Sequence, residues 1–235
     1  NDTLATADDL IAGSAIKGQV SSRTDIDYYA FAATSAGSIS IDFDPTIDSS
    51  YSYYKVSLLD STGTVLASQD VGKDTKFSTG VSSAGTYYVA VDDSTYHDSG
   101  EYSLKASLAA GSTANVETES NDTRATADNL IAGSAIKGQV SSKTDIDYYA
   151  FAATSAGSIS IDFDPTINSS YNNYYKVSLL DSTGTVLASQ DVGKDTKFST
   201  GVSSAGTYYV AVDDSTSHDS GEYSLKASLA AGSTA

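Results

Sequence analysis

The feature that most constrains this chain is an internal duplication. Residues 1–114 and 121–235 are the same sequence apart from a handful of substitutions and one inserted residue. Solenoid repeats recur every 20–50 residues or so, whereas this repeat has the length of a complete domain. The sequence therefore predicts two tandem domains, residues 1–114 and 121–235, joined by an acidic linker at residues 115–120.

Short stretches of alternating apolar and polar residues predict β-strands in each copy. In the clearest case, Ser38–Phe43, the alternation places Ile39, Ile41 and Phe43 on one face. Turn signals such as Asp60-Ser61-Thr62-Gly63 separate the stretches, and no stretch shows a helical period. We expect an all-β fold, with two tandem antiparallel β-sandwich domains of the jelly-roll kind. The strands expected in the first copy are Ala15–Val20, Asp27–Ala33, Ser38–Phe43, Lys55–Leu59, Val65–Gln69, Thr75–Thr79, Thr86–Val91 and Glu101–Ser107.

The charge balance excludes two classes of partner. The formal net charge is −17, from 30 acidic and 13 basic residues, so nucleic acid and anionic membrane surfaces would repel the chain. No apolar run approaches the ~20 residues that span a bilayer. We expect no nucleic-acid partner and no membrane insertion. Divalent cations would be attracted, although the acidity could equally serve solubility alone.

No catalytic residues are predicted. The chain has no cysteine, which excludes disulfides, thiolate metal sites and a cysteine nucleophile. His97 and His218 are the only histidines, and their Ser and Asp neighbours are nearly consecutive in a loop, which does not give a converging triad. Carboxylate pairs could serve glycoside hydrolysis, but none is marked as a buried proton donor and there is no tryptophan to stack on a sugar.

Oxygen-bearing side chains are concentrated where the linker meets the second copy. Glu117, Glu119, Asn121 and Asp122 supply four such side chains within six residues. Calcium takes several oxygen ligands from carboxylates, amides and carbonyls. In an extended chain Glu117, Glu119 and Asn121 point to the same side, but alone they would form an open, weak site.

A second acidic edge is offered by Asp145 and Asp147, which occupy alternate positions at the start of a predicted strand. Both can therefore face the same way. Together with the linker acids they predict a calcium site in the second copy. The alternative is that the aspartates cap turns and the two glutamates belong to a solvated linker.

Three motifs together resemble a known family. They are the Glu-x-Glu-x-Asn-Asp entry into the second copy, the Asp-x-Asp-Tyr-Tyr-x-Phe run, and the Gly-Thr-Tyr-Tyr-Val-Ala-Val strand. They look like the bacterial pre-peptidase C-terminal domain, a family that includes the collagen-binding domains of clostridial collagenases. The resemblance covers essentially the whole of each copy. It implies a β-sandwich appended to secreted proteins and, in the collagen-binding branch, calcium held between the N-terminal linker and a surface loop.

The resemblance also assigns ligands to each copy. In the first copy the matching residues are Asn1, Asp2, Asp25 and Asp27, without an upstream Glu-x-Glu, so we expect a weaker or empty site there. Backbone carbonyls near Ser141-Ser142 would complete the shell in the second copy. The side chains implied as its calcium ligands are Glu117, Glu119, Asn121, Asp122, Asp145 and Asp147.

Tyrosines in polar stretches are candidate ligand contacts, because exposed tyrosine gives a large contact area at low entropic cost. In the family's collagen-binding branch, surface tyrosines contact the ligand. Position 96 is tyrosine and its counterpart is Ser217, so the copies can differ in affinity. The alternative is an adaptable solvent loop. The candidates are Tyr51, Tyr53, Tyr54 and Tyr96 in the first copy and Tyr171, Tyr174 and Tyr175 in the second.

The function expected from the sequence is a non-catalytic, calcium-stabilised binding or targeting module of a secreted or cell-surface bacterial protein. Its partner would be an extracellular polymer such as collagen or a polysaccharide, and we expect the chain to be a monomer. One alternative is a repeat, spacer or adhesion unit of a large surface adhesin, because such proteins often carry near-identical arrays. A hydrolytic enzyme is a remote alternative.

Overall fold

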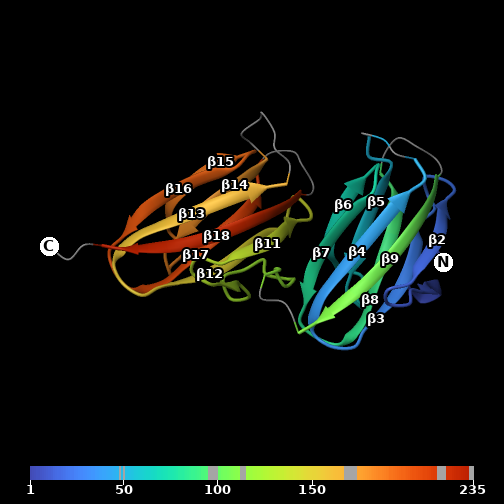
Figure 1. Cartoon of the computed structure of the whole chain (residues 1–235), viewed down its shortest axis with the longest axis horizontal. Coiled ribbons are helices and arrows are strands. Elements are labelled where there is room, and N and C mark those ends of the chain that lie inside the picture. Colours follow the sequence, from blue (N-terminus) through green and yellow to red (C-terminus); the bar gives the residue numbers. More distant parts are fainter. Residues whose placement is uncertain are drawn as a thin grey trace. The chain divides into compact units, whose positions relative to one another are not determined.

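The computed structural model describes residues 1–47, 49, 51–94, 100–111, 115–166, 174–215 and 221–232. The chain divides into two compact units, Asn1–Thr113 and Ala114–Ala235 (Figure 1). Residues 115–120, expected as a linker, belong to the second unit. Tyr96, Tyr171 and both histidines lie outside the described residues.

The first unit consists of two packed β-sheets. The strand orders are β1-β3-β8-β5-β6 and β2-β9-β4-β7. All pairs are antiparallel except β1 with β3. A single turn of 3-10 helix, Leu4–Thr6, precedes them. The strands are β1 (Asp8–Asp9), β2 (Ala15–Val20), β3 (Asp27–Ala33), β4 (Gly37–Pro45), β5 (Tyr54–Leu59), β6 (Val65–Val71), β7 (Thr75–Val81), β8 (Gly85–Asp93) and β9 (Gly100–Ala110).

The second unit repeats this arrangement, with sheets β10-β12-β17-β14-β15 and β11-β18-β13-β16. In both units the eight longer strands are distributed between two four-stranded groups, as in a jelly roll. The predicted all-β, tandem sandwich fold is confirmed. The strands are β10 (Asp128–Leu130), β11 (Ala135–Val140), β12 (Ile146–Ala153), β13 (Gly157–Pro165), β14 (Tyr175–Leu180), β15 (Val186–Val192), β16 (Thr196–Val202), β17 (Gly206–Asp214) and β18 (Gly221–Ala231).

The core lies between the sheets and follows the predicted alternation. Ile39, Ile41 and Phe43 on β4 are each fully buried. Asp42, on the opposite face, forms an ion pair with Lys105 on the neighbouring β9 at 3.0 Å. Successive side chains of a strand point to opposite faces, so one apolar face suffices to fix each strand in the sandwich. No helix among the described residues is long and apolar enough to cross a membrane.

Two of the candidate tyrosines are core residues. Tyr54 and Tyr175 begin β5 and β14 and are 3% and 4% exposed. The ring of Tyr54 packs against Phe43 with 5.2 Å between the ring centroids. Their expected place in exposed loops is wrong, because each strand begins one residue earlier than predicted. Tyr51 is 73% exposed, whereas Tyr53 and Tyr174 are half-buried against the core.

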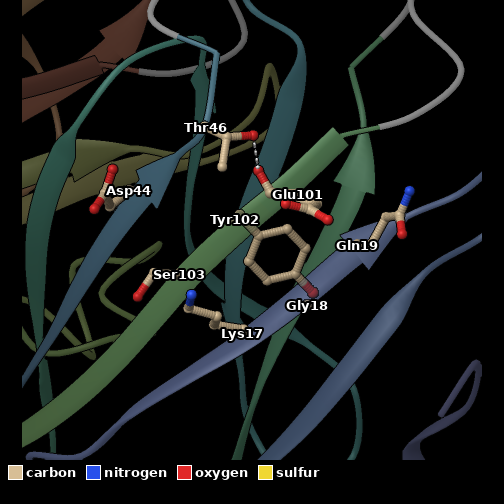
Figure 2. Close-up of a pocket in the computed structure, with 8 residues that line it drawn as sticks. All are labelled: Lys17, Gly18, Gln19, Asp44, Thr46, Glu101, Tyr102 and Ser103. Atoms are coloured by element: carbon tan, nitrogen blue, oxygen red, sulfur yellow. Dashed lines mark hydrogen bonds between the residues drawn. The ribbon is translucent and has the colours of Figure 1, made fainter.

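One glycine in each unit makes room for a buried tyrosine pair. Gly18 on β2 lies opposite Tyr102 on β9, and Figure 2 shows the tyrosine ring directed toward it. A Cβ at Gly18 would lie 2.3 Å from the Tyr102 hydroxyl oxygen and 2.4 Å from that of Tyr29. Gly138 holds the same position against Tyr223 and Tyr149, at 2.4 Å from both hydroxyl oxygens.

Replacing Gly138 by alanine should destabilise the second unit by about 1–3 kcal/mol, the usual effect of overpacking a core. The free energy of unfolding in urea measures this. Gly201→Ala is the matched control, since its Cβ would meet only the Gly157 carbonyl oxygen, at 4.0 Å. Equal losses in the two variants would show that the tyrosine pair does not require a glycine.

Candidate metal centre

The segment expected as a linker is part of the second unit's sheet. Val116 forms a parallel bridge with Lys137 at the outer edge of β11. The Glu117 amide donates to the Lys137 carbonyl, and the Lys137 amide donates to the Asn115 carbonyl, both at 2.9 Å. The Thr118 amide donates to Asp128 Oδ2 at 2.6 Å. These bonds hold the backbone that carries the two linker glutamates.

Glu117 is completely buried. Its Oε1 accepts a hydrogen bond from the backbone amide of Gln139, and its Oε2 accepts one from the Tyr149 hydroxyl at 2.8 Å. Burial raises the pKa of Glu117 well above its usual value, and the nearby Asp145 charge adds to the effect. The carboxyl is therefore held in place by donors on the sandwich, but its charge is not compensated there.

A chain of hydroxyl groups connects Glu117 to a second buried acid. The Tyr149 and Tyr223 hydroxyl oxygens are 2.7 Å apart, and Tyr223 donates to Asp147 Oδ2. The chain from Glu117 to Asp147 has three close oxygen–oxygen contacts but only two hydroxyl protons. Each contact needs one proton. While both carboxylates are ionised, one of the three contacts is therefore left without a proton. Burial raises the pKa values of both Glu117 and Asp147.

The acidic side chains converge in two overlapping groups. Glu117, Glu119 and Asp147 place carboxylate oxygens within 4.8 Å of one another, and so do Glu119, Asp122 and Asp145. Glu119 is common to both groups. Asp145 is fixed by the backbone amide and hydroxyl of Ser141, which donate to its Oδ2 at 2.6 and 2.7 Å. The structure thus brings together the predicted linker acids and both members of the predicted second edge.

Three buried oxygens in this region have no hydrogen-bond donor among the described residues. They are Glu119 Oε1, Asn121 Oδ1 and Asp147 Oδ1. A buried polar atom left unpaired costs about 1–3 kcal/mol. A hard divalent cation would satisfy such oxygens, and an all-oxygen set of carboxylates and amides is the set that calcium prefers. The residues present therefore fit a calcium ion.

Burial and mutual repulsion shift the titration of these acids. Burial, with the charges of Glu117, Asp145 and Asp122, raises the pKa of Glu119 to about 10. Burial raises the pKa of Asp145 to about 6, although the Ser141 hydrogen bonds oppose the shift. The cluster thus favours either bound protons or bound positive charge.

The first copy holds part of the same arrangement. Asp27 is buried and accepts a hydrogen bond from Tyr102, whose hydroxyl oxygen lies 2.8 Å from that of Tyr29. In this copy there are two oxygen–oxygen contacts, and the two tyrosine hydroxyls provide one proton for each. Asp25 accepts from the amide and hydroxyl of Ser21 at 2.6 Å. In the described part of this copy, no three acidic residues bring their oxygens together.

Among the predicted ligands of the first copy, Asn1 and Asp25 lie close to Asp27, whereas Asp2 lies apart from them. The side chain of Asp2 is 72% exposed, and it pairs with the N-terminal ammonium group at 3.4 Å. Asn1 is half-buried, and its side-chain amide donates to the Tyr28 carbonyl at 3.4 Å. Whether this copy binds calcium, and how strongly, stays a prediction.

The groups that support the acids were not predicted from the sequence. Tyr149 had a signal, since it belongs to the Asp-x-Asp-Tyr-Tyr motif. Tyr223 lies in the second-copy counterpart of the predicted strand Glu101–Ser107, where nothing marked it as a supporting group. Asp128 carried no signal, because its contact with Thr118 depends on the docking of the linker segment.

Comparison with known proteins finds no matching family model and no matching curated protein. Among solved structures, the chain is similar to the pre-peptidase C-terminal domain of a Bacillus anthracis collagenase. The identity is 23%, over 43% of this chain and 93% of that domain, with a TM-score of 0.35. That domain belongs to the family that the sequence motifs resemble.

Two further likenesses span more of the chain. The CUB1-EGF-CUB2 region of human MASP-1/3 is 11% identical over 93% of this chain and 94% of that one, with a TM-score of 0.27. The M60 catalytic domain of Clostridium perfringens ZmpB with its two CBM51 domains is 10% identical over 87% of this chain and 33% of that one, with a TM-score of 0.29. At these identities and TM-scores the likenesses carry no statement about function.

In calcium-free buffer, the second unit should lose stability as the pH rises. A carboxyl whose pKa is higher in the folded than in the unfolded chain binds its proton more tightly when folded, so ionisation favours unfolding. The ionisation of Asp145 lowers the stability between its ordinary pKa of 3.8 and its raised pKa of about 6. That of Glu119 does so between 4.5 and about 10. The slope is at most about 1.4 kcal/mol per pH unit for each proton.

Thermal unfolding in chelator at pH 4.5, 6 and 8 measures this trend. Glu119→Gln removes one of the titrating groups and should flatten it. Stability that is constant or rises over this range would show that the acids are not confined together in the metal-free protein.

Proposed function

We propose that the second unit binds calcium at the junction between the Glu117–Asn121 segment and the sandwich. The observation that carries this proposal is the buried acidic cluster, in which three oxygens have no hydrogen-bond donor within the described ranges. A divalent cation would offset the mutual repulsion of the acids and fix the segment against β11. The side chains that would hold it are Glu117, Glu119, Asn121, Asp122, Asp145 and Asp147.

The role of the cation in this proposal is structural. Glu117 and Asp147 are tied to tyrosine hydroxyls within the sandwich. Such an arrangement suits a site that holds a segment in place. We therefore propose a non-catalytic binding module of a secreted or cell-surface bacterial protein. Extracellular modules commonly bind calcium with dissociation constants of about 0.1–1 mM.

The partner proposed is an extracellular polymer such as collagen or a polysaccharide. Among the described candidate tyrosines, Tyr51 is the one that offers an exposed aromatic surface. The family resemblance points to collagen, because surface tyrosines contact the ligand in its collagen-binding branch. No nucleic-acid partner and no membrane insertion are proposed, and the module would act as a monomer.

A second candidate is a repeat or spacer unit of a large surface adhesin. The near-identity of the two copies favours it. So does the bonding of residues 115–118 to the second unit, because a calcium ion there would stiffen the junction that leads into each repeat.

Asp147→Asn should weaken calcium binding by about 100-fold or more, since even groups outside the ligand shell commonly contribute about 10–100-fold. The same substitution should stabilise the calcium-free protein, because it removes a buried carboxylate from among like charges. Calorimetric titration and thermal unfolding in chelator measure the two effects. Asp27→Asn in the first copy is the matched control and should leave the tightest site unchanged. Unaltered titration of the Asp147 variant would refute the proposed site.

The polymer partner is tested by co-sedimentation with insoluble collagen, chitin and cellulose, in calcium and in chelator. One polymer should retain the chain, and Tyr51→Ala should reduce retention without changing the free energy of unfolding. Ser52→Ala, at the neighbouring position, is the control. If no polymer retains the chain in either condition, the spacer function is favoured instead.

A further inference from the structure

A hollow of about 530 Å³ lies on the outer face of the first unit's four-stranded sheet, over β2, β9 and β4. Successive residues of a strand face opposite ways. Phe43 and Tyr102 point into the core, so the residues on either side of them point outward. The hollow is lined by Lys17, Gly18 and Gln19 on β2, by Glu101, Tyr102 and Ser103 on β9, and by Asp44 and Thr46 at the end of β4 (Figure 2).

Strand register sorts the outward side chains into two rows. Lys17 on β2 and Asp44 on β4 both lie opposite Ser103 on β9, the strand between them. In the next row Gln19 lies opposite Glu101. Neighbouring strands are about 4.8 Å apart, and the two rows are about 6.7 Å apart. Because Ser103 has a short side chain, the space between the longer side chains of its row stays open.

Hydrogen-bond donors and acceptors are interleaved around this space. The Lys17 ammonium and the Gln19 amide can donate, the carboxylates of Asp44 and Glu101 can only accept, and the Ser103 hydroxyl can do both. Within the described ranges, the side chains of Lys17, Gln19 and Ser103 form no hydrogen bond or ion pair with the protein. These groups are therefore free to bond to a ligand.

Asp44 is also next to a second carboxyl group. Phe43 on β4 lies opposite Thr75 on β7, so the residues that follow and precede them, Asp44 and Asp74, are side by side. A hydrogen bond with Asp44 raises the pKa of Asp74, and the charge of Asp44 adds to the shift. A ligand group that donates to Asp44 would relieve the repulsion between the two carboxyls.

The lining favours an uncharged ligand that carries several hydroxyl groups. Tyr102 is 2% exposed, and the other lining residues are polar or glycine, so the hollow offers no surface for an apolar group. The formal net charge of −17 repels anions. A sugar hydroxyl can donate to a carboxylate and accept from an ammonium or amide group. The volume of the hollow is within the range of about 300–1,000 Å³ found for small-molecule sites.

We propose that this hollow binds an uncharged sugar residue of a polysaccharide. The Lys17 ammonium and the Gln19 amide donate to oxygens of the sugar, and the carboxylates of Asp44 and Glu101 accept from its hydroxyls. The proposal rests on the proposed function, since it names the polymer partner of the module as a polysaccharide. Without an aromatic ring to stack on the sugar, the expected dissociation constant for a short oligosaccharide is about 1 mM.

The binding residues of the first unit are only partly available in the second. Gln139 is the counterpart of Gln19, and it is 1% exposed, whereas Gln19 is exposed. Residues 115–117 run beside β11, the strand that carries Gln139. The side-chain amide of Gln139 is therefore out of reach of an external sugar. We expect one sugar site in the chain, in the first unit.

The test is saturation-transfer NMR on the full chain with cellohexaose, chitohexaose, maltohexaose and mannohexaose. At least one of them should bind with a dissociation constant of about 1 mM. Lys17→Met and Asp44→Ala should each weaken that binding by about tenfold or more, because each removes a charged hydrogen-bond partner of the sugar. If no oligosaccharide binds at concentrations about tenfold above this constant, the proposal is wrong.

The duplication supplies matched controls for both variants. Lys137→Met and Asp164→Ala make the same changes in the second unit and should leave the binding unchanged. Thermal unfolding of all four variants checks that each is folded. Equal losses of binding from the substitutions in the two units would overturn the assignment to the first unit. Binding of a triple-helical collagen-model peptide that Asp44→Ala abolishes would make the hollow a protein-binding site and would also overturn the proposal.

The same titrations in calcium and in chelator separate this proposal from the proposed calcium site. None of the lining residues belongs to the acidic cluster, so the affinity for the sugar should be the same in both buffers and in Asp147→Asn. If the chain binds calcium but no oligosaccharide, only the sugar site fails. If an oligosaccharide binds but calcium does not, the sugar site stands and the calcium site fails.

Discussion

Several carboxylates buried within a few ångströms of one another repel, and the form of the second unit's edge depends on how that repulsion is balanced. Glu117 and Asp147 are fully buried, and Glu119 lies within 4.8 Å of both. Bound protons or a bound cation can offset this repulsion. The raised pKa values of all three acids reflect their burial next to one another. The position of the Glu117–Asn121 segment against β11 and the binding of protons or a cation by the acidic cluster therefore depend on each other.

The duplication lets one copy serve as the reference for the other. The tyrosine pair and the glycine opposite it occur in both units with nearly equal distances. They therefore belong to the sandwich itself. The buried glutamate and the third oxygen–oxygen contact occur only with the docked segment. What the segment adds is a charged extension to a framework that forms without it.

Alternation was enough to predict the sandwich. Each of the eight strands expected in the first copy is present, because apolar side chains at every second position can be buried only on one face of a sheet. The parallel strands β1 and β10 were not predicted, since two or three residues are too few to alternate. The misplacement of Tyr54 was a boundary error of a single residue, which was enough to move an aromatic ring from solvent to core.

The acids of the candidate site were predictable because they are close in sequence and chemically uniform. Their supporting groups were not, because strand register sets those contacts. Gly138 meets Tyr223 only through the pairing of β11 with β18, and Tyr149 reaches Glu117 only when the segment is docked. Register is fixed by the burial pattern of the whole sheet, so a local motif cannot reveal it.

The near-identity of the copies has a consequence for how the chain folds. The strand sequence Gly-Glu-Tyr-Ser-Leu-Lys-Ala-Ser-Leu-Ala-Ala is identical in β9 and β18, and so is Gly-Ser-Ile-Ser-Ile-Asp-Phe-Asp-Pro in β4 and β13. A newly made β9 can thus pair with β13 as favourably as with β4, which makes exchange of strands between neighbouring units a natural misfolding route in tandem repeats. During synthesis β4 is complete before β13 is made, so the order of synthesis favours the pairing of β9 with β4.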